Sequence, residues 1–135
     1  MDKVIFASND WLDRARAELE NLVSTHGEAG VRFCLCEVFT NAPASIDPSG
    51  TMAWHFYIDG KSVTVDVGEV NDADVKIHVD YQKILPAARL VYTPEILEER
   101  AKQPPGTQFD HAEGDFGLTP PYITELHNRL AVITA

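Results

Sequence analysis

The chain has 135 residues, of which 44% are hydrophobic, so it is long enough to bury an apolar core without disulfides or a metal. Its 11 basic and 21 acidic residues give a formal net charge of −10, which repels phosphate backbones and argues against nucleic acid as a partner. The N-terminus lacks the apolar core of a secretory signal, and no segment is long enough to span a membrane. We therefore expect a soluble, cytoplasmic protein whose residues 1–135 form a single domain.

The first predicted element is an amphipathic helix. Apolar residues recur at helical spacing after Ser8, which is suited to cap the helix N-terminus, and they continue to His26. Gly27 and Gly30 then end the pattern.

The next stretch, VRFCLCEVF at residues 31–39, predicts a strand that is buried on both sides over part of its length. Glu37 is the one residue that interrupts its apolar Phe33 face. The opposite face carries Cys34 and Cys36, whose spacing suits neither a bond between them nor a complete metal site. We predict that both are free, buried thiols.

The stretch MAWHFYIDGKSVTVDV, residues 52–67, alternates strictly on either side of Asp59-Gly60 and predicts a β-hairpin with a type I′ turn at that dipeptide. In this register Trp54 faces Val65 across the hairpin. One face carries nearly all the large apolar side chains, more than a two-stranded ribbon can bury. Helices must therefore cover that face, with or without a ligand between.

Beyond the hairpin, residues 75–80 alternate as a fourth strand, and the short NDAD connection predicts that it pairs antiparallel with the third. The period then changes to 3.6 residues and predicts a helix over 81–92 that Pro86 interrupts. The sequence TPE at 93–95 predicts the start of a short helix that runs to about Lys102.

The last part of the chain completes the expected fold. QFDHAEGDFG, residues 108–117, predicts a fifth strand with a turn at Gly114, and TPP at 119–121 opens a final helix. The order of elements predicts an α+β fold, with a five-stranded, mainly antiparallel sheet and helices covering one face.

Several features follow one another in a set order over residues 50–135. They are the hairpin, Ala73-Asp74-Val75 at the start of the next strand, a helix, and Gly114-Asp115 ahead of an apolar C-terminal helix. This order resembles the sterol carrier protein 2 family, although residues 92–106 are longer and more helical here than in that family. The resemblance implies non-catalytic binding and carriage of an apolar lipid (a sterol, fatty acid or fatty acyl-CoA). It places the lipid in a cavity between sheet and helices, without a metal or cofactor.

Aromatic and aliphatic side chains on the inward strand faces and helix stripes converge on one layer, as the lining of an apolar pocket requires. The same stripes also build an ordinary α+β core, so plain core packing is the competing interpretation of the pattern. Under the resemblance, the predicted ligand-binding residues are Phe39, Trp54, Phe56, Leu85, Tyr92, Phe116, Tyr122 and Leu126.

An enzyme of isomerase or hydratase type, acting on a hydrophobic substrate, is the alternative function. Its candidate general base is His55, which lies across the predicted hairpin from Thr64 and diagonal to Asp66. Asp115 beside Phe116 is a candidate carboxylic acid in apolar surroundings. Turn and helix-start chemistry is the simpler role for Asp115.

Two further alternatives stay open. His78 and Asp80 could share a metal site with Asp110 and His111 if their strands are neighbours. The chain could also act as an accessory subunit that docks on a lipid- or steroid-metabolising enzyme, with ILEER at residues 96–100 as the contact, or form a homodimer through its hairpin edge.

Overall fold

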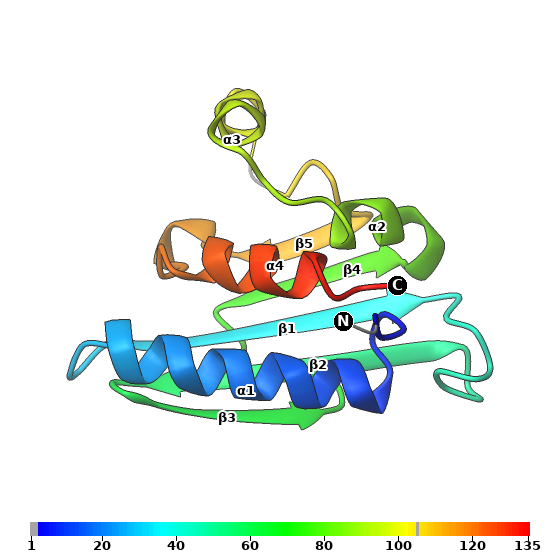
Figure 1. Cartoon of the computed structure of the whole chain (residues 1–135), viewed down its shortest axis with the longest axis horizontal. Helices are drawn as coiled ribbons and strands as arrows, with labels where there is room; N and C mark the ends of the chain where they lie inside the picture. Colours follow the sequence, from blue (N-terminus) through cyan, green and yellow to red (C-terminus); the bar gives the residue numbers. More distant parts are fainter. Residues whose placement is uncertain (1–2, 105) are drawn as a thin grey trace.

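The computed structural model describes residues 3–104 and 106–135. Its elements in chain order are α1 (Asn9–His26), β1 (Arg32–Thr40), β2 (Thr51–Asp59), β3 (Ser62–Val67), β4 (Val75–Asp80), α2 (Tyr81–Ala88), α3 (Pro94–Ala101), β5 (His111–Gly114), the 3-10 helix η1 (Phe116–Leu118) and α4 (Ile123–Ala131). Figure 1 shows α1 and α4 side by side over one face of the sheet, whereas α3 stands away from it. The prediction of an α+β fold with helices over one sheet face is confirmed.

The five strands form a mixed sheet in the order β3-β2-β1-β4-β5, with three antiparallel pairs and one parallel pair. The predicted antiparallel pairing of the fourth strand with the third is wrong, because β4 lies parallel to β1. Residues 68–74 are long enough to cross two strands spaced about 4.8 Å apart. The crossing is anchored where the Asp74 carboxylate accepts the Cys34 N–H at 2.7 Å and the Asp74 N–H donates to the Cys34 carbonyl at 2.9 Å.

The hairpin of β2 and β3 forms as expected, but its register differs by two residues from the prediction. Asp59 pairs with Ser62, so Gly60 and Lys61 occupy the turn, and Trp54 pairs with Val67 rather than with Val65. Gly60 has φ +63 at the first turn position, the pattern of a type II′ turn. Because the shift is an even number of residues, every side chain stays on its predicted face.

The helices begin where the capping residues indicate. Ser8 accepts the Trp11 N–H at 3.2 Å ahead of α1, and Thr93 accepts the Ile96 N–H at 3.3 Å ahead of α3. The predicted helix over 81–92 is shorter, since α2 ends at Ala88 with Pro86 inside it. The final helix begins at Ile123, just beyond the two prolines.

A buried aromatic cluster lies where the segment before α1 meets α1, β1 and α2. The Phe6 ring lies 5.1, 4.9 and 5.3 Å from the rings of Trp11, Phe39 and Tyr81, and the Tyr81 hydroxyl donates to the Phe6 carbonyl at 2.6 Å. In the described part of the chain, none of the helices combines the length and apolarity needed to cross a membrane. Cys34 and Cys36 are free and buried, as predicted.

Candidate ligand-binding cavity

A cavity of about 170 Å³ lies between the covered sheet face and the helices. Its walls come from the segment before α1 and from α1, β1, β2, α2, the segment around Tyr92, Phe109 and α4. Among the described residues, the polar groups of this apolar lining are the Glu37 carboxyl on β1, the His127 ring on α4, the Tyr92 phenol and two indole N–H groups. A mostly apolar wall with a few polar groups is typical of a small-molecule site.

Five of the predicted ligand-binding residues line this cavity: Phe39, Trp54, Phe56, Tyr92 and Leu126. They come from two strands, the α2–α3 segment and α4, which are distant in sequence. The three strand residues share the covered sheet face because inward positions recur every second residue along β1 and β2. Tyr92 and Leu126 line the cavity from the segments that cover this face.

Three predicted residues lie outside the lining. Leu85 packs against the core, while other α2 residues face the cavity. Phe116 stacks on Phe109 at 6.3 Å and borders a separate depression beside α3. Tyr122, one residue before the last helix, stacks on His26 at 5.8 Å in a groove near the end of α1.

The sequence prediction missed several lining residues, of which Phe6, Trp11, Glu37 and His127 matter most. Phe6 lies just before the first helix and Trp11 in its first turn, a stretch that carries no signal of a pocket. Glu37 did carry one, because it is the only charged residue on the apolar face of β1. A lone carboxyl in an otherwise apolar alternation indicates either a special partner or a cavity.

Glu37 is held by its neighbour across the β1–β2 pair. The Trp54 indole N–H donates to Glu37 Oε1 at 2.8 Å, and the two residues are register partners. Among the described residues, this is the one hydrogen bond that the carboxyl receives. Burial among apolar side chains raises the pKa of Glu37 to about 7, against a smaller lowering by the Trp54 hydrogen bond.

His127 fixes the segment that leads from α2 to α3. Its ring stacks on Tyr92 at 3.8 Å, and its Nε2 lies 2.7 Å from the Leu90 carbonyl, so Nε2 carries the hydrogen. Burial lowers the pKa of His127, which favours the neutral ring. Asn128 adds two hydrogen bonds to the Tyr92 backbone, at 2.7 and 3.2 Å. These contacts hold Tyr92 against α4 at the cavity wall.

The raised pKa of Glu37 predicts a measurable pH dependence of stability. Because the carboxyl binds its proton more tightly folded than unfolded, its contribution to stability falls as pH rises from about 4.5 to about 7. The full loss is at most about 3 kcal/mol, from 1.36 kcal/mol per pH unit. Urea unfolding of the wild type and Glu37→Gln between pH 4 and 8 measures it, since glutamine keeps the acceptor for Trp54. The free energy of unfolding of the variant is expected to rise relative to that of the wild type as pH rises. Parallel stability profiles would contradict this prediction.

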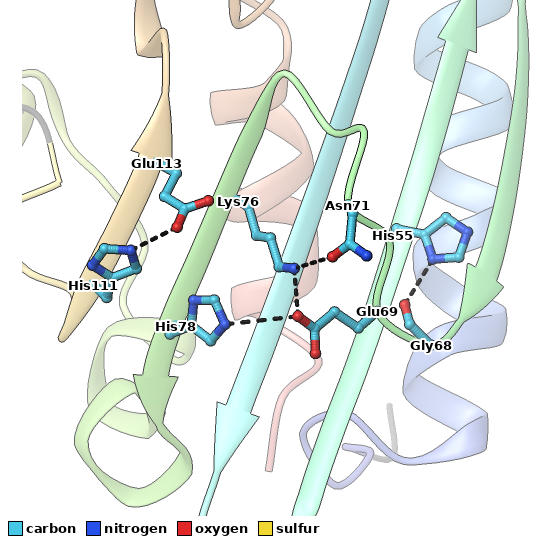
Figure 2. A network of polar contacts seen from close by, with 8 residues as sticks. All are labelled: His55, Gly68, Glu69, Asn71, Lys76, His78, His111 and Glu113. Atoms are coloured by element: carbon cyan, nitrogen blue, oxygen red, sulfur yellow. Dashed lines mark hydrogen bonds and ion pairs between the residues drawn. The ribbon is translucent and has the colours of Figure 1, made fainter.

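Three of the side chains weighed for catalysis or metal binding lie on the opposite, uncovered sheet face, as Figure 2 shows: His55, His78 and His111. There Lys76 pairs with Glu69 and donates to Asn71 at 3.1 Å, and the Lys76 hydrogen bond lowers the pKa of Glu69. His78 lies 4.0 Å from Glu69 and is the register partner of His111 on β5. The two strands are thus neighbours, yet within residues 3–104 and 106–135 no three His, Cys, Asp or Glu side chains are placed to hold a metal ion.

His55 also belongs to this uncovered face. It lies directly opposite Asp66 rather than opposite Thr64, because of the shifted hairpin register. Its Nδ1 lies 2.8 Å from the Gly68 carbonyl oxygen. The ring therefore donates to this carbonyl, and the hydrogen bond holds the ring in place. Asp115 is exposed and accepts the Gly117 N–H at 2.8 Å, as a turn residue. Neither side chain reaches the cavity lining.

A small mixed sheet with helices over one face and an apolar cavity between the two layers defines the class of fold. Among solved structures, the chain is similar to one described as sterol carrier protein 2, with a TM-score of 0.56 and 14% identity, over 96% of this chain and 99% of that chain. The protein therefore has a sterol carrier protein 2-like fold, which confirms the resemblance at the level of fold.

Two further solved structures are similar with TM-scores below 0.5, which are too low to support an inference. One is the ubiquinone synthesis protein UbiJ-SCP2, with a TM-score of 0.43 and 16% identity over 90% of this chain and 83% of that chain. The other is a stereoselective inverting sec-alkylsulfatase from Pseudomonas sp., with 0.39 and 16% over 88% of this chain and 14% of that chain. No family model matches the sequence, and no curated protein does.

Proposed function

We propose that the protein binds and carries an apolar lipid in the cavity between its sheet and helices, without catalysing a reaction. The observation that carries this proposal is the lining itself, in which aromatic and aliphatic side chains from eight parts of the chain face one shared space. A core that was simply packed would fill that space with side chains, since protein interiors leave few voids larger than a water molecule.

The cavity is too small to hold a long lipid without a change in its walls. A volume of about 170 Å³ is below the roughly 300–1,000 Å³ of sites for drug-sized ligands. A long acyl chain or sterol therefore requires one wall to move outward. Ala87 and Ala88 on the α2 wall are half-buried, and the adjoining Leu90 and Val91 are exposed. We expect this wall to open, because Phe39, Trp54 and Phe56 of the sheet wall are fully buried.

The test uses the protein's own fluorescence. Both tryptophans of the chain, Trp11 and Trp54, line the cavity, so an apolar ligand there changes their emission. Titration with 1-decanol is expected to give saturable one-to-one binding, and excess ligand should raise the Tm by mass action. Ala87→Phe, which fills the cavity, should weaken binding at least tenfold.

Gln82→Phe on the exposed side of α2 is the matched control, because it adds the same ring outside the cavity. The affinity of Gln82→Phe for 1-decanol should equal that of the wild type. The proposal fails if the folded wild type shows no saturable binding, or if Ala87→Phe binds as well as Gln82→Phe.

A second candidate function is proton transfer on a hydrophobic substrate, and Glu37 is the observation that favours it. A carboxyl in an apolar cavity with a pKa of about 7 is suited to act as a general acid or base near neutral pH. Isomerisation of a β,γ-unsaturated ketone requires such a proton shuttle. An enzyme would lose this turnover in Glu37→Gln while still binding the substrate, whereas a carrier shows no turnover in either form.

A further inference from the structure

We propose that the cavity recognises its lipid by a hydroxyl group donated to Glu37, and that it discriminates against lipids that carry a carboxylate. This inference rests on the proposed function and adds to it the chemical class of the ligand's polar end.

The geometry at Glu37 leaves an acceptor facing the cavity. The Trp54 N–H occupies Oε1, whereas Oε2 has no hydrogen-bond partner among the described residues. A carboxylate offers about four acceptor positions, so one indole N–H leaves most of them unused. Leu35 and Phe39, the neighbours of Glu37 on the same strand face, surround it with apolar surface. A hydrogen-bond donor on the ligand would therefore satisfy the acceptor that the protein leaves unpaired at Glu37.

The other polar groups of the lining supply little to pair with an anion. His127 uses its Nε2–H on the Leu90 carbonyl, which leaves Nδ1 as an acceptor in the neutral ring. The Trp11 indole N–H donates to Thr134 at 3.2 Å. The Tyr92 hydroxyl is a neutral group that can donate, and the described residues of the lining include no lysine or arginine. A ligand carboxylate would thus lie beside Glu37 without a counterion, which is costly in an apolar site.

The Arg100 guanidinium offers a rival arrangement for a ligand carboxylate. The Arg100 guanidinium sits 4.4 Å from the centre of the Tyr92 ring, outside the lining. A fatty acid could enter tail first and leave its carboxylate at Arg100. The experiment therefore needs a variant at each of the two positions.

Loss of the Glu37 proton sharpens the discrimination against ligand carboxylates. A hydroxyl both donates and accepts, so it pairs with the carboxyl in either protonation state, whereas a ligand carboxylate pairs only with protonated Glu37. The groups that face Glu37 from the other elements are Trp54 on β2, His127 on α4 and Tyr92, and none of them carries a fixed charge. Carboxylate binding should consequently weaken as pH rises through about 7.

The test compares three probes that share one ten-carbon chain: 1-decanol, decanoate and decyl methyl ether. Tryptophan fluorescence titrations at pH 6 and pH 8 measure each affinity. At pH 8 we expect 1-decanol to bind about tenfold or more tighter than either other probe, since a hydrogen bond to a charged group is worth about 1.5–3 kcal/mol. The affinity of decanoate should drop between pH 6 and pH 8, and that of 1-decanol should change little.

The variants separate the explanations. Glu37→Gln should raise the affinity of decanoate relative to 1-decanol about tenfold and remove the pH dependence, whereas Arg100→Gln should leave both affinities unchanged. Decanoate binding at pH 8 as tightly as 1-decanol, with a loss in Arg100→Gln, overturns the proposal in favour of the rival. Equal binding of 1-decanol and its ether also overturns it and leaves the carrier function intact. If none of the probes binds, the proposed function fails as well.

Discussion

Replacement of Trp54 by alanine is expected to lower the free energy of unfolding by about 3–5 kcal/mol, a large share of the roughly 5–15 kcal/mol of a typical domain. Trp54 is 2% exposed. Its ring contacts Trp11 edge-on at 5.3 Å and Phe56 at 5.6 Å. The substitution removes these contacts and deprives Glu37 of its one N–H donor among the described residues. Urea unfolding followed by circular dichroism measures the loss.

Two further variants separate the contribution of the Trp54 ring from that of its N–H group and provide a control. Trp54→Phe keeps an aromatic ring but lacks the N–H, so we expect it to cost about 1–3 kcal/mol. Val67→Ala changes the residue paired with Trp54 on β3, and because Val67 is 59% exposed we expect a change within about 0.5 kcal/mol. A loss below about 1 kcal/mol in Trp54→Ala would show that the ring is not part of the packed core.

Gly114→Ala is expected to separate β5 from β4 or to cost more than about 3 kcal/mol of stability. Gly114 has φ +99, and an added Cβ would lie 1.9 Å from the Asp74 carbonyl oxygen, a backbone atom that cannot yield. The same oxygen accepts the Asp115 N–H at 3.2 Å. Because Phe109 lies just before β5 and lines the cavity, the substitution should also weaken ligand binding.

Gly30→Ala provides the control for this experiment. Gly30 has a similar φ of +84 but no atom within 4 Å of the added Cβ, so only the backbone strain of about 1–2 kcal/mol applies. Hydrogen exchange of the β4 and β5 amides, together with urea unfolding, distinguishes the two variants. Equal losses in both would mean that the close approach of Gly114 to Asp74 does not matter.

The Gly114 contact also explains part of the resemblance found in the sequence. Ala73-Asp74-Val75 and Gly114-Asp115 are about forty residues apart, yet Gly114 is the register partner of Val75. The two short motifs are thus the two sides of one strand pair. Their residue types follow from the close approach of the backbones, and they do not touch the ligand-binding cavity.

The elements of this fold could be predicted from the sequence because they depend on interactions between residues close in the chain. Ser8 and Thr93 cap helices through N–H groups three residues away, and the alternation of β1 and β2 sorts their side chains onto two faces. The faces survived the wrong hairpin register, since a shift of two residues preserves them. The aromatic residues of the covered face, including Trp54 and Phe56, were identified for the same reason.

Strand order and the shape of the site depend on contacts between distant residues, and only the tertiary structure decided them. Residues 68–74 could have formed a tight connection, but the Asp74 bonds to Cys34 place β4 beside β1 and parallel to it. The start of α4 and the inward side of α2 decided that Tyr122 and Leu85 lie outside the cavity. The sequence by itself determined that Glu37 interrupts an apolar face. That this face borders a cavity, where the carboxyl is desolvated and paired with Trp54, follows only from the packing of helices against the sheet.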